Sequence, residues 1–259
     1  MSDDTHDNKK DGVVISARGV HKRFGDKLIY DGLDLDVRRG EVLTVLGPSG
    51  RGKSVLLKLV IGLLKPEEGR ILIDGTDVVP LAERELREVR RKVAMVFQGA
   101  ALFDSLTVGE NVAYGLREHY RWPAAEVRER VAECLEWVGL PGTERMHPSD
   151  LSGGMKKRVA LARAVAPGPE VILYDEPTTG LDPSNTRRIN ELIRALQERL
   201  GVTSIVITHD MQSAWAVSDR VALLQRHRLD LIVDAAEAKG APPSELDRFV
   251  QGEEMEMQT

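Results

Sequence analysis

The sequence has little of several features that mark particular protein classes. Among its 259 residues Cys134 is the single cysteine, which excludes a disulfide within the chain and fits a reducing compartment. No apolar run reaches the roughly 18 residues of a membrane-spanning helix, and the apolar segment Val55–Leu64 is interrupted by Lys58. Met1–Asp11 is polar and lacks the apolar core of a signal peptide, so we expect a disordered tail. Any link to a membrane is therefore expected to come through a partner.

An excess of positive charge is also missing. Lys and Arg number 36 against 41 Asp and Glu, which gives a formal charge of −5 and no net basic field for nucleic acid. Hydrophobic residues make up 42%, as in ordinary soluble proteins, and the length suits one large domain or two small ones. Cys134 lies in a helical pattern, which favours a buried core thiol.

Strands and helices alternate along most of the chain, which predicts an α/β fold with a mostly parallel sheet covered by helices. Strand patterns occur at residues 13–20, 33–37, 41–47, 71–75, 93–98, 171–176, 204–210 and 221–225. Helical patterns occur at residues 54–64, 81–92, 108–120, 123–138 and 183–200. The mostly helical span from about 99 to 150 interrupts the alternation, so we interpret it as an insertion or subdomain.

A complete phosphate-loop pattern, GxxxxGK[ST], lies between a predicted strand and a predicted helix. Its residues are Gly47, Pro48, Ser49, Gly50, Arg51, Gly52, Lys53 and Ser54. The glycines let backbone N–H groups wrap phosphates, Lys53 reaches the β and γ phosphates, and Ser54 supplies a hydroxyl for Mg²⁺. The start of the helix adds its dipole. This loop predicts a site for ATP and Mg²⁺.

Polar side chains that could complete such a site follow three other predicted strands. Asp175 and Glu176 end the strand VILYDE, where Asp175 could hold Mg²⁺ through water and Glu176 could act as general base. His209 ends SIVITHD and could contact the γ phosphate or orient the water. Gln98 ends VAMVFQ and could reach both metal and water. Each is also compatible with a solvated strand end, and the phosphate loop favours the functional interpretation.

A second glycine-rich helix start, LSGG at Leu151–Gly154, lacks the lysine of a phosphate loop. Ser152 fits an N-cap, so a simple helix cap is one interpretation. The other is an anion site that serves a phosphate brought by another molecule.

Taken in order, GPSGRGKS, Gln98, LSGGM, VILYDE, GLDP and His209 resemble the motifs of ATP-binding cassette (ABC) ATPases over about Val13–Gln225. The resemblance implies a P-loop NTPase fold with a mostly parallel core sheet, helices on both faces, an N-terminal antiparallel β part and a helical subdomain. We expect a tail at 1–11, the ATPase domain at 12–240 with its helical subdomain at about 99–165, and a C-terminal helix and tail at 241–259.

The same resemblance implies a head-to-tail dimer of two copies. Ser152, Gly153 and Gly154 of one copy would then cover the ATP held by the other. Leu181 and Asp182 would lie at the dimer interface. The resemblance also implies that an N-terminal aromatic stacks on adenine. Phe24 is the candidate, with Tyr30 as the alternative. The metal ligands would be Ser54, Gln98 and Asp175, and the catalytic residues Glu176, His209 and Gln98.

Within the family, the string ALFDSLTV and the methionine after LSGG resemble MlaF-like ATPases of Mla and Mce-type phospholipid transport. This implies a peripheral subunit at the cytoplasmic face of the inner membrane. It would bind a permease, with a periplasmic lipid-binding subunit and a small cytosolic regulator as further partners. The chain departs from the family where His227–Asp230 replaces an expected glycine turn. A closing helix with Ser244 as its cap is predicted near the end.

Three other functions remain open at the sequence level. One is the ATPase subunit of another ABC importer, for example for amino acids. A second is an ATPase without a membrane partner that acts on a cytosolic assembly; an apolar docking groove around Leu102, Phe103 and Leu106 would count against it. The third is a catalytically dead scaffold, which the presence of Lys53 and Glu176 disfavours.

Overall fold

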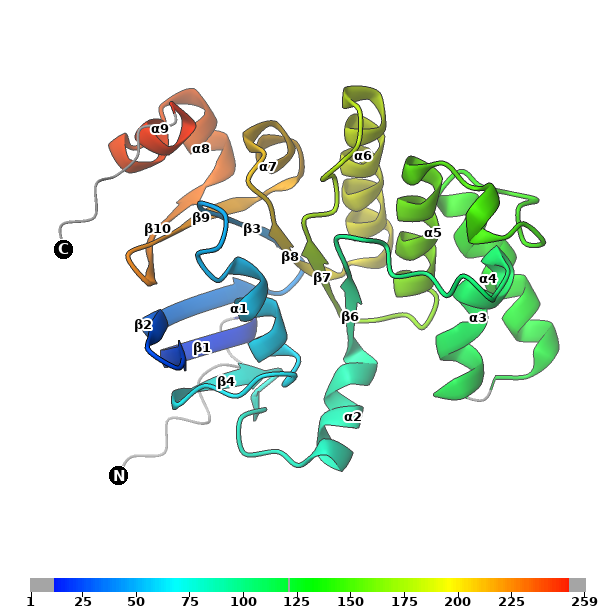
Figure 1. Ribbon diagram of the computed structural model, residues 1–259, viewed down its shortest axis with the longest axis horizontal. Helices are drawn as coiled ribbons and strands as arrows, with labels where there is room; N and C mark the ends of the chain where they lie inside the picture. The colour runs from blue at the N-terminus through cyan, green and yellow to red at the C-terminus, as the bar shows by residue number, and fades with distance from the viewer. Residues whose placement is uncertain (1–11, 121, 252–259) are drawn as a thin grey trace. The chain divides into compact units, whose positions relative to one another are not determined.

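The computed structural model describes residues 12–120 and 122–251 (Figure 1). It forms two compact units, one made of the residues up to Val89 and from Ile205 onwards, the other of Arg90–Ser204. The tail expected at 1–11 and the last residues of the expected C-terminal segment lie outside the described part. The predicted domain boundaries therefore stay predictions.

An antiparallel sheet of the first unit has the strand order β2-β1-β4-β5. Its strands are β1 (Val13–Phe24), β2 (Lys27–Arg38), β4 (Glu68–Ile73) and β5 (Thr76–Asp77). β1 pairs with β2 through the two-residue turn Gly25–Asp26 and with β4 on its other side. The predicted antiparallel N-terminal part is thus confirmed.

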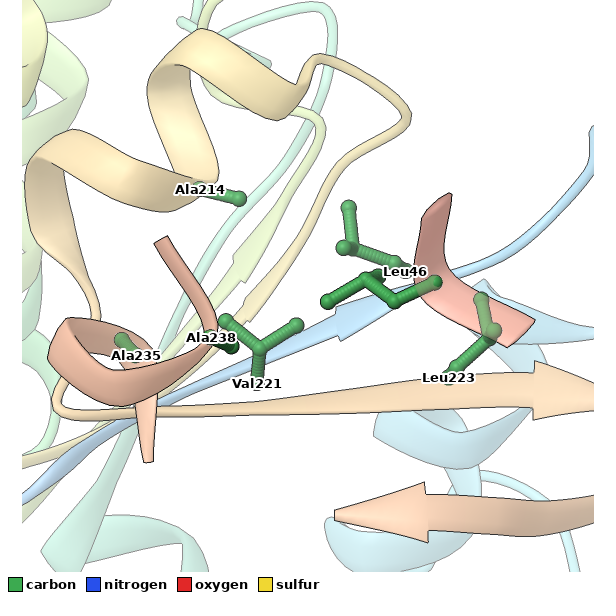
Figure 2. Close-up of a cluster of buried hydrophobic side chains, with 7 residues drawn as sticks. Leu46, Ala214, Val221, Leu223, Ala235 and Ala238 are labelled. Atoms are coloured by element: carbon green, nitrogen blue, oxygen red, sulfur yellow. The ribbon is translucent and has the colours of Figure 1, made fainter. Parts of the chain in front are cut away.

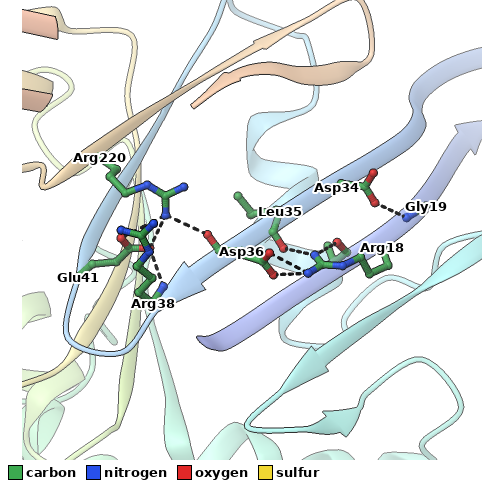
Figure 3. Close-up of polar contacts among 9 residues, drawn as sticks. Arg18, Gly19, Asp34, Leu35, Asp36, Arg38, Glu41 and Arg220 are labelled. Carbon is green, nitrogen blue, oxygen red and sulfur yellow. Dashed lines mark hydrogen bonds and ion pairs between the residues drawn. The ribbon is translucent and has the colours of Figure 1, made fainter. Parts of the chain in front are cut away.

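Two arginines tie β2 to its surroundings (Figure 3). Arg18 of β1 donates to both carboxylate oxygens of Asp36 at 2.7 Å, which supports the β1–β2 register. Glu41 accepts from the backbone N–H of Arg38 at 2.6 Å and from Arg220 at 3.1 Å. Glu41 is buried, so this paired contact fixes the turn that leads from β2 into the next strand.

That next strand, β3 (Val42–Leu46), is buried at every position and ends directly before the phosphate loop. β10 (Arg228–Asp234), β9 (Arg220–Gln225), β3 and β8 (Thr203–Ile207) are successive neighbours in a second sheet, and the boundary between the two units falls within β8. β3 pairs with β9 in parallel and β10 with β9 antiparallel. The β9–β10 hairpin forms without a glycine, because Arg226 and His227 adopt left-handed φ angles of 42° and 67°.

A cluster of small and branched apolar side chains packs the C-terminal helices onto this sheet (Figure 2). The helices of this part are α7 (Met211–Val217), α8 (Ala235–Gly240) and α9 (Ser244–Val250). The cluster comprises Leu46, Ala214, Val221, Leu223, Ala235, Ala238 and Leu246. The predicted closing helix is confirmed, but its predicted cap is wrong: Ser244 is the first helical residue, and its hydroxyl contacts Glu245 instead. Two further helices are α1 (Lys53–Val60) and α2 (Glu83–Lys92), the latter running from the first unit into the second.

The second unit contains a parallel strand pair and a group of helices (Figure 1). β6 (Val93–Val96) pairs with β7 (Val171–Asp175), and both match predicted strands. α3 (Val108–Glu118), α4 (Ala124–Trp137) and α5 (Gly153–Val165) pack on one another, with a short 3-10 turn at Pro148–Asp150 before α5. The helices predicted at 108–120 and 123–138 are confirmed.

Local chemistry explains why these helices could be predicted. Asp182 caps α6 (Pro183–Leu200) by accepting two N–H groups of its first turn at 3.0 Å, and Gly201 ends it at a left-handed φ of 63°.

Cys134 of α4 is buried as expected, and burial raises the pKa of its thiol to about 11. Within the described ranges, no helix is both long enough and apolar enough to cross a bilayer.

Candidate functional site

The phosphate loop, residues 47–54, joins the buried strand β3 to α1 in the first unit. Lys53 is the first residue of α1 and is only 6% exposed. Its ammonium donates to the carbonyls of Gly47 at 2.7 Å and Pro48 at 3.1 Å. The cation is therefore held inside the curve of the loop, while the tip at residues 48–51 is exposed.

Two glycines of the loop are required by its geometry. Gly47 has φ 154°, and a Cβ there would lie 2.8 Å from the carbonyl oxygen of Leu224. Gly52 has φ 100°, and a Cβ there would lie 2.5 Å from a methyl carbon of Ile29. No acidic residue lies in the first turn of α1, so the helix itself places no negative charge at its positive end. The loop fits an anionic phosphate chain.

Tyr30 packs under the phosphate loop. It is fully buried, and its hydroxyl donates to the carbonyl of Gly52 at 2.6 Å. Burial raises the pKa of this phenol far above its usual range. A buried ring cannot stack on a nucleotide base, so the adenine role considered for Tyr30 is wrong. Phe24 is 46% exposed at the end of β1, with the Lys22 ammonium 5.1 Å from its ring centre, and its adenine role stays a prediction.

His209 lies between β8 and α7 in the first unit. Its imidazole is exposed. The next residue, Asp210, caps α7 by accepting two N–H groups of the first helical turn, and its own N–H donates to Thr208 Oγ1 at 3.0 Å. The backbone on both sides of His209 is thereby fixed.

The two carboxylates of the second unit follow each other where β7 ends. Asp175 is the last strand residue and is 9% exposed. Glu176 has a left-handed φ of 49°, which is uncommon for a residue with a side chain. Its carboxylate accepts from Thr179 Oγ1 at 3.0 Å. Glu176 therefore leaves the strand conformation where β7 ends. Non-glycine residues in such conformations cluster at functional sites.

Gln98 lies in the loop after β6, and its side chain is exposed. Its backbone carbonyl accepts a hydrogen bond from the Lys157 ammonium. Two residues further on, Ala100 and Ala101 have left-handed φ angles of 63° and 50°, and their carbonyls accept from Arg163 at 2.8 and 2.7 Å. Sequence reasoning missed the roles of Lys157 and Arg163, because nothing in the local pattern indicates contacts so distant along the chain.

The LSGG segment, Leu151–Gly154, opens α5. Ser152 is its N-cap and accepts from the N–H of Met155 at 3.2 Å, so the simple capping role is present. A Cβ on Gly154 would lie 2.6 Å from Asn185 Oδ1, whereas a Cβ on Gly153 would meet nothing closer than 4.0 Å. Packing within the chain therefore requires glycine at 154 but not at 153. Gly153 leaves exposed backbone at a positive helix end.

The interface candidates Leu181 and Asp182 lie just before α6. Asp182, besides capping α6, accepts from the Asn185 amide at 2.5 Å. The Asn185 side chain also borders Gly154. The start of α6 and the start of α5 are thus adjacent, and the second unit brings the two segments predicted to face another copy together.

Comparisons with known proteins identify the family. The fold and the phosphate loop define a P-loop nucleotide-binding protein, and the family model for ABC transporters matches residues 30–179. The chain belongs to the ABC transporter family. It is 46% identical over 206 residues to the intermembrane phospholipid transport system ATP-binding protein MlaF of Haemophilus influenzae, covering 80% of this chain and 78% of that protein.

Other relatives carry different names at similar identity. The probable ribonucleotide transport ATP-binding protein mkl of Mycobacterium leprae is 44% identical over 218 residues, which is 84% of this chain and 63% of mkl. This chain thus spans less than two thirds of that relative. The methionine import ATP-binding protein MetN 2 of Rhodococcus jostii is 46% identical over 238 residues, 89% of this chain and 70% of the relative.

Solved structures confirm the ABC ATPase fold. A dimeric ATP-binding cassette in a post-hydrolysis state, bound to ADP and Pi, superposes with a TM-score of 0.77 at 34% identity, covering 85% of this chain and 98% of that one. CbiO1 of Clostridium perfringens, part of an ABC transporter complex, gives 0.83 at 30% identity, covering 93% and 96%. The fold class predicted from the sequence is therefore confirmed.

Proposed function

We propose that the chain is the ATP-hydrolysing subunit of an ABC transporter that moves phospholipid between the inner and outer membranes through a separate permease. The observation that carries the ATPase part is the phosphate loop, in which a buried Lys53 ammonium at the start of α1 is held by two loop carbonyls. The phosphate chain of ATP offers oxygens that replace those carbonyls as acceptors. The 46% identity to MlaF supports the phospholipid part.

In this proposal the residues of the site have different tasks, and Gln98 serves both the metal and the attacking water. The loop N–H groups and Lys53 bind the β and γ phosphates, and Phe24 stacks on adenine. Ser54, Gln98 and Asp175 hold Mg²⁺, which when bound neutralises phosphate charge and orients the γ phosphate. Glu176 accepts a proton from the attacking water, and His209 keeps that water and the γ phosphate in line.

A second copy of the chain completes the proposed site. The chain has one phosphate loop and one LSGG segment, so two copies would form two sites head to tail. The exposed Gly153 backbone and the Ser152 hydroxyl would then meet the γ phosphate held by the other copy. A related cassette solved as a dimer with ADP and Pi supports this arrangement.

An exposed aromatic pair supports a docking surface for a protein partner. Phe103 is 42% exposed and its ring centre lies 4.6 Å from that of Tyr114, which is 38% exposed. The loop carrying Phe103 is fixed by the buried Asn111, which accepts from the Phe103 N–H at 2.8 Å. Aromatic residues at a fixed surface are typical of protein interfaces. We assign this surface to the permease, at the cytoplasmic face of the inner membrane.

The most specific part of the proposal is the identity of the transported substrate. MetN 2 is as similar as MlaF, so an amino-acid importer ATPase is the second candidate.

The test is a mild-detergent pulldown of the chain from native membranes, with mass spectrometry of proteins and lipids. Phospholipid recovered with a permease and a periplasmic lipid-binding subunit is the expected result, and a small cytosolic regulator would be seen in the same sample. A permease recovered with an amino-acid receptor would overturn the lipid assignment. Soluble partners alone would overturn the membrane assignment as well.

A further inference from the structure

Lys157 of α5 places a buried ammonium between two backbone carbonyls of the second unit. Its side chain is 7% exposed. The ammonium donates to the carbonyl of Gln98, which lies 59 residues away along the chain, and to the carbonyl of Glu176 at 3.5 Å, 19 residues away. One side chain thus joins the loop that carries Gln98 to the turn that carries Glu176.

Stability alone gives little reason for a charge at this position. Burial lowers the pKa of Lys157, while the charges of Glu176 and Asp175 act in the opposite direction. Taking an ammonium out of water costs several kcal/mol before its contacts offset the loss. A buried charge is therefore weak evidence for a stabilising role, and the two carbonyls that Lys157 contacts indicate what else it does.

The two joined segments both have uncommon backbone conformations. Glu176 has φ 49°, and the loop after Gln98 has Ala100 at φ 63° and Ala101 at φ 50°. Such conformations persist only where the surroundings hold them. Arg163 donates to the carbonyls of Ala100 and Ala101, and Lys157 donates to those of Gln98 and Glu176. Both cationic side chains belong to α5. α5 itself starts at the LSGG segment.

We propose that Lys157 is a positioning residue for ATP hydrolysis. It contacts no substrate, but it fixes the Gln98 loop and the Glu176 turn relative to the helix that begins with LSGG. This inference rests on the proposed function, in which Glu176 is the general base and Gln98 orients metal and water. A base must lie within hydrogen-bond reach of the proton that it removes, so a shift of its backbone carbonyl is felt in the chemical step.

The test compares steady-state ATP hydrolysis by three variants of the full chain. Lys157→Met keeps the length of the side chain and removes its donors. Its kcat is expected to fall about 10- to 100-fold, because a misplacement of about 1 Å costs up to about a hundredfold. Its KM for ATP is expected to stay within about twofold, because the contact does not bind nucleotide. Lys157→Arg, which keeps charge and donors, should recover most of kcat.

Lys156→Met is the matched control, since it removes the same charge one position earlier on α5. It should keep both kinetic constants, and thermal unfolding should show that all three variants are folded. If Lys157→Met does not fold, Lys157→Gln replaces it, because its amide retains donors of similar reach; a kcat between those of wild type and inactive enzyme is then expected.

Three results would overturn the proposal. Wild-type kcat in a folded Lys157→Met protein is one, and a rise in KM without a fall in kcat is another. The third is equal loss in Lys157→Met and Lys157→Arg, which would indicate a packing role. If the unmodified chain neither binds nor hydrolyses ATP, the proposed function itself fails. If it hydrolyses ATP and the variants match it, the positioning role alone fails.

Discussion

At the scale of single residues, the phosphate loop is stabilised by a hydrogen bond from the buried hydroxyl group of Tyr30. Tyr30 Oη donates to the Gly52 carbonyl at 2.6 Å, while the same carbonyl accepts from the N–H of Val55 at 2.7 Å. Gly52 is the N-cap of α1, so this carbonyl marks the point where loop becomes helix. A side chain of the N-terminal sheet thereby sets the position of the first helical turn, which includes Lys53.

Changing Tyr30→Phe tests this support. The variant loses one hydrogen bond, worth about 1 kcal/mol, and leaves the ring packing in place. Since the Gly52 carbonyl keeps a backbone donor, the expected effect is a rise of about fivefold in KM for ATP with kcat unchanged. Tyr120→Phe is the matched control, because Tyr120 also donates to a backbone carbonyl, that of Arg91, at 2.9 Å. Equal KM values in the two variants would contradict the role of Tyr30.

At the scale of elements, the sequence predicted those whose ends carry their own signals. α6 starts at an aspartate cap followed by proline and ends at glycine, so its bounds were predicted at 183–200 and found there. The β9–β10 turn carries no such signal, because Arg226 and His227 fill the left-handed positions where glycine is usual. Ser244 was assigned the cap of α9, yet a residue that prefers caps also fits a first helical turn, and Pro243 takes the N-cap.

The candidate site shows the same division between local and distant information. Gly47, Lys53, Asp175 and Ser152 could be found from short motifs, because each motif is a strand end or a helix start that the sequence itself marks. The hydrogen bond of Tyr30 to the loop could not be found in this way, and neither could the contacts that Lys157 and Arg163 make with backbone carbonyls. Their partners lie between 19 and 63 residues away, and only the folded chain brings them together.

The start of α5 offers an element-scale prediction, because its two glycines differ in what surrounds them. In Gly154→Ala the new Cβ must displace the Asn185 side chain, which is bonded to Asp182. A loss of about 1–3 kcal/mol in the free energy of unfolding is expected. Gly153→Ala has room in the chain itself, so its stability should change by less than about 0.5 kcal/mol.

Activity should separate the same two variants in another way. If the exposed Gly153 backbone approaches the nucleotide of a second copy, Gly153→Ala should lower ATPase activity although the protein is as stable as wild type. Urea unfolding measures the stability of each variant, and ATP hydrolysis by the same samples measures its activity. Full activity in Gly153→Ala would show that no group approaches closely there.

At the scale of the whole molecule, the phosphate loop and the LSGG segment belong to different compact units of the chain. Lys53 and the loop lie in the first unit, and the LSGG segment opens a helix of the second with its glycine backbone exposed. With the net charge at −5, two copies repel each other weakly at long range. In the proposed dimer, ATP would supply the attraction between copies, through its γ phosphate and the two positive helix starts.

Glu176→Gln should turn this attraction into a stable dimer. The amide cannot accept the proton of the attacking water, so hydrolysis should fall by about 10²- to 10⁴-fold while ATP still binds. With ATP and Mg²⁺, light scattering should then report twice the monomer mass of 28.7 kDa, and with ADP the monomer mass. Adding Lys53→Ala to the same chain should restore the monomer in ATP, because the nucleotide no longer binds tightly. A dimer that forms equally well without nucleotide would mean that the γ phosphate does not hold the copies together, and normal turnover by Glu176→Gln would remove Glu176 from its role as base.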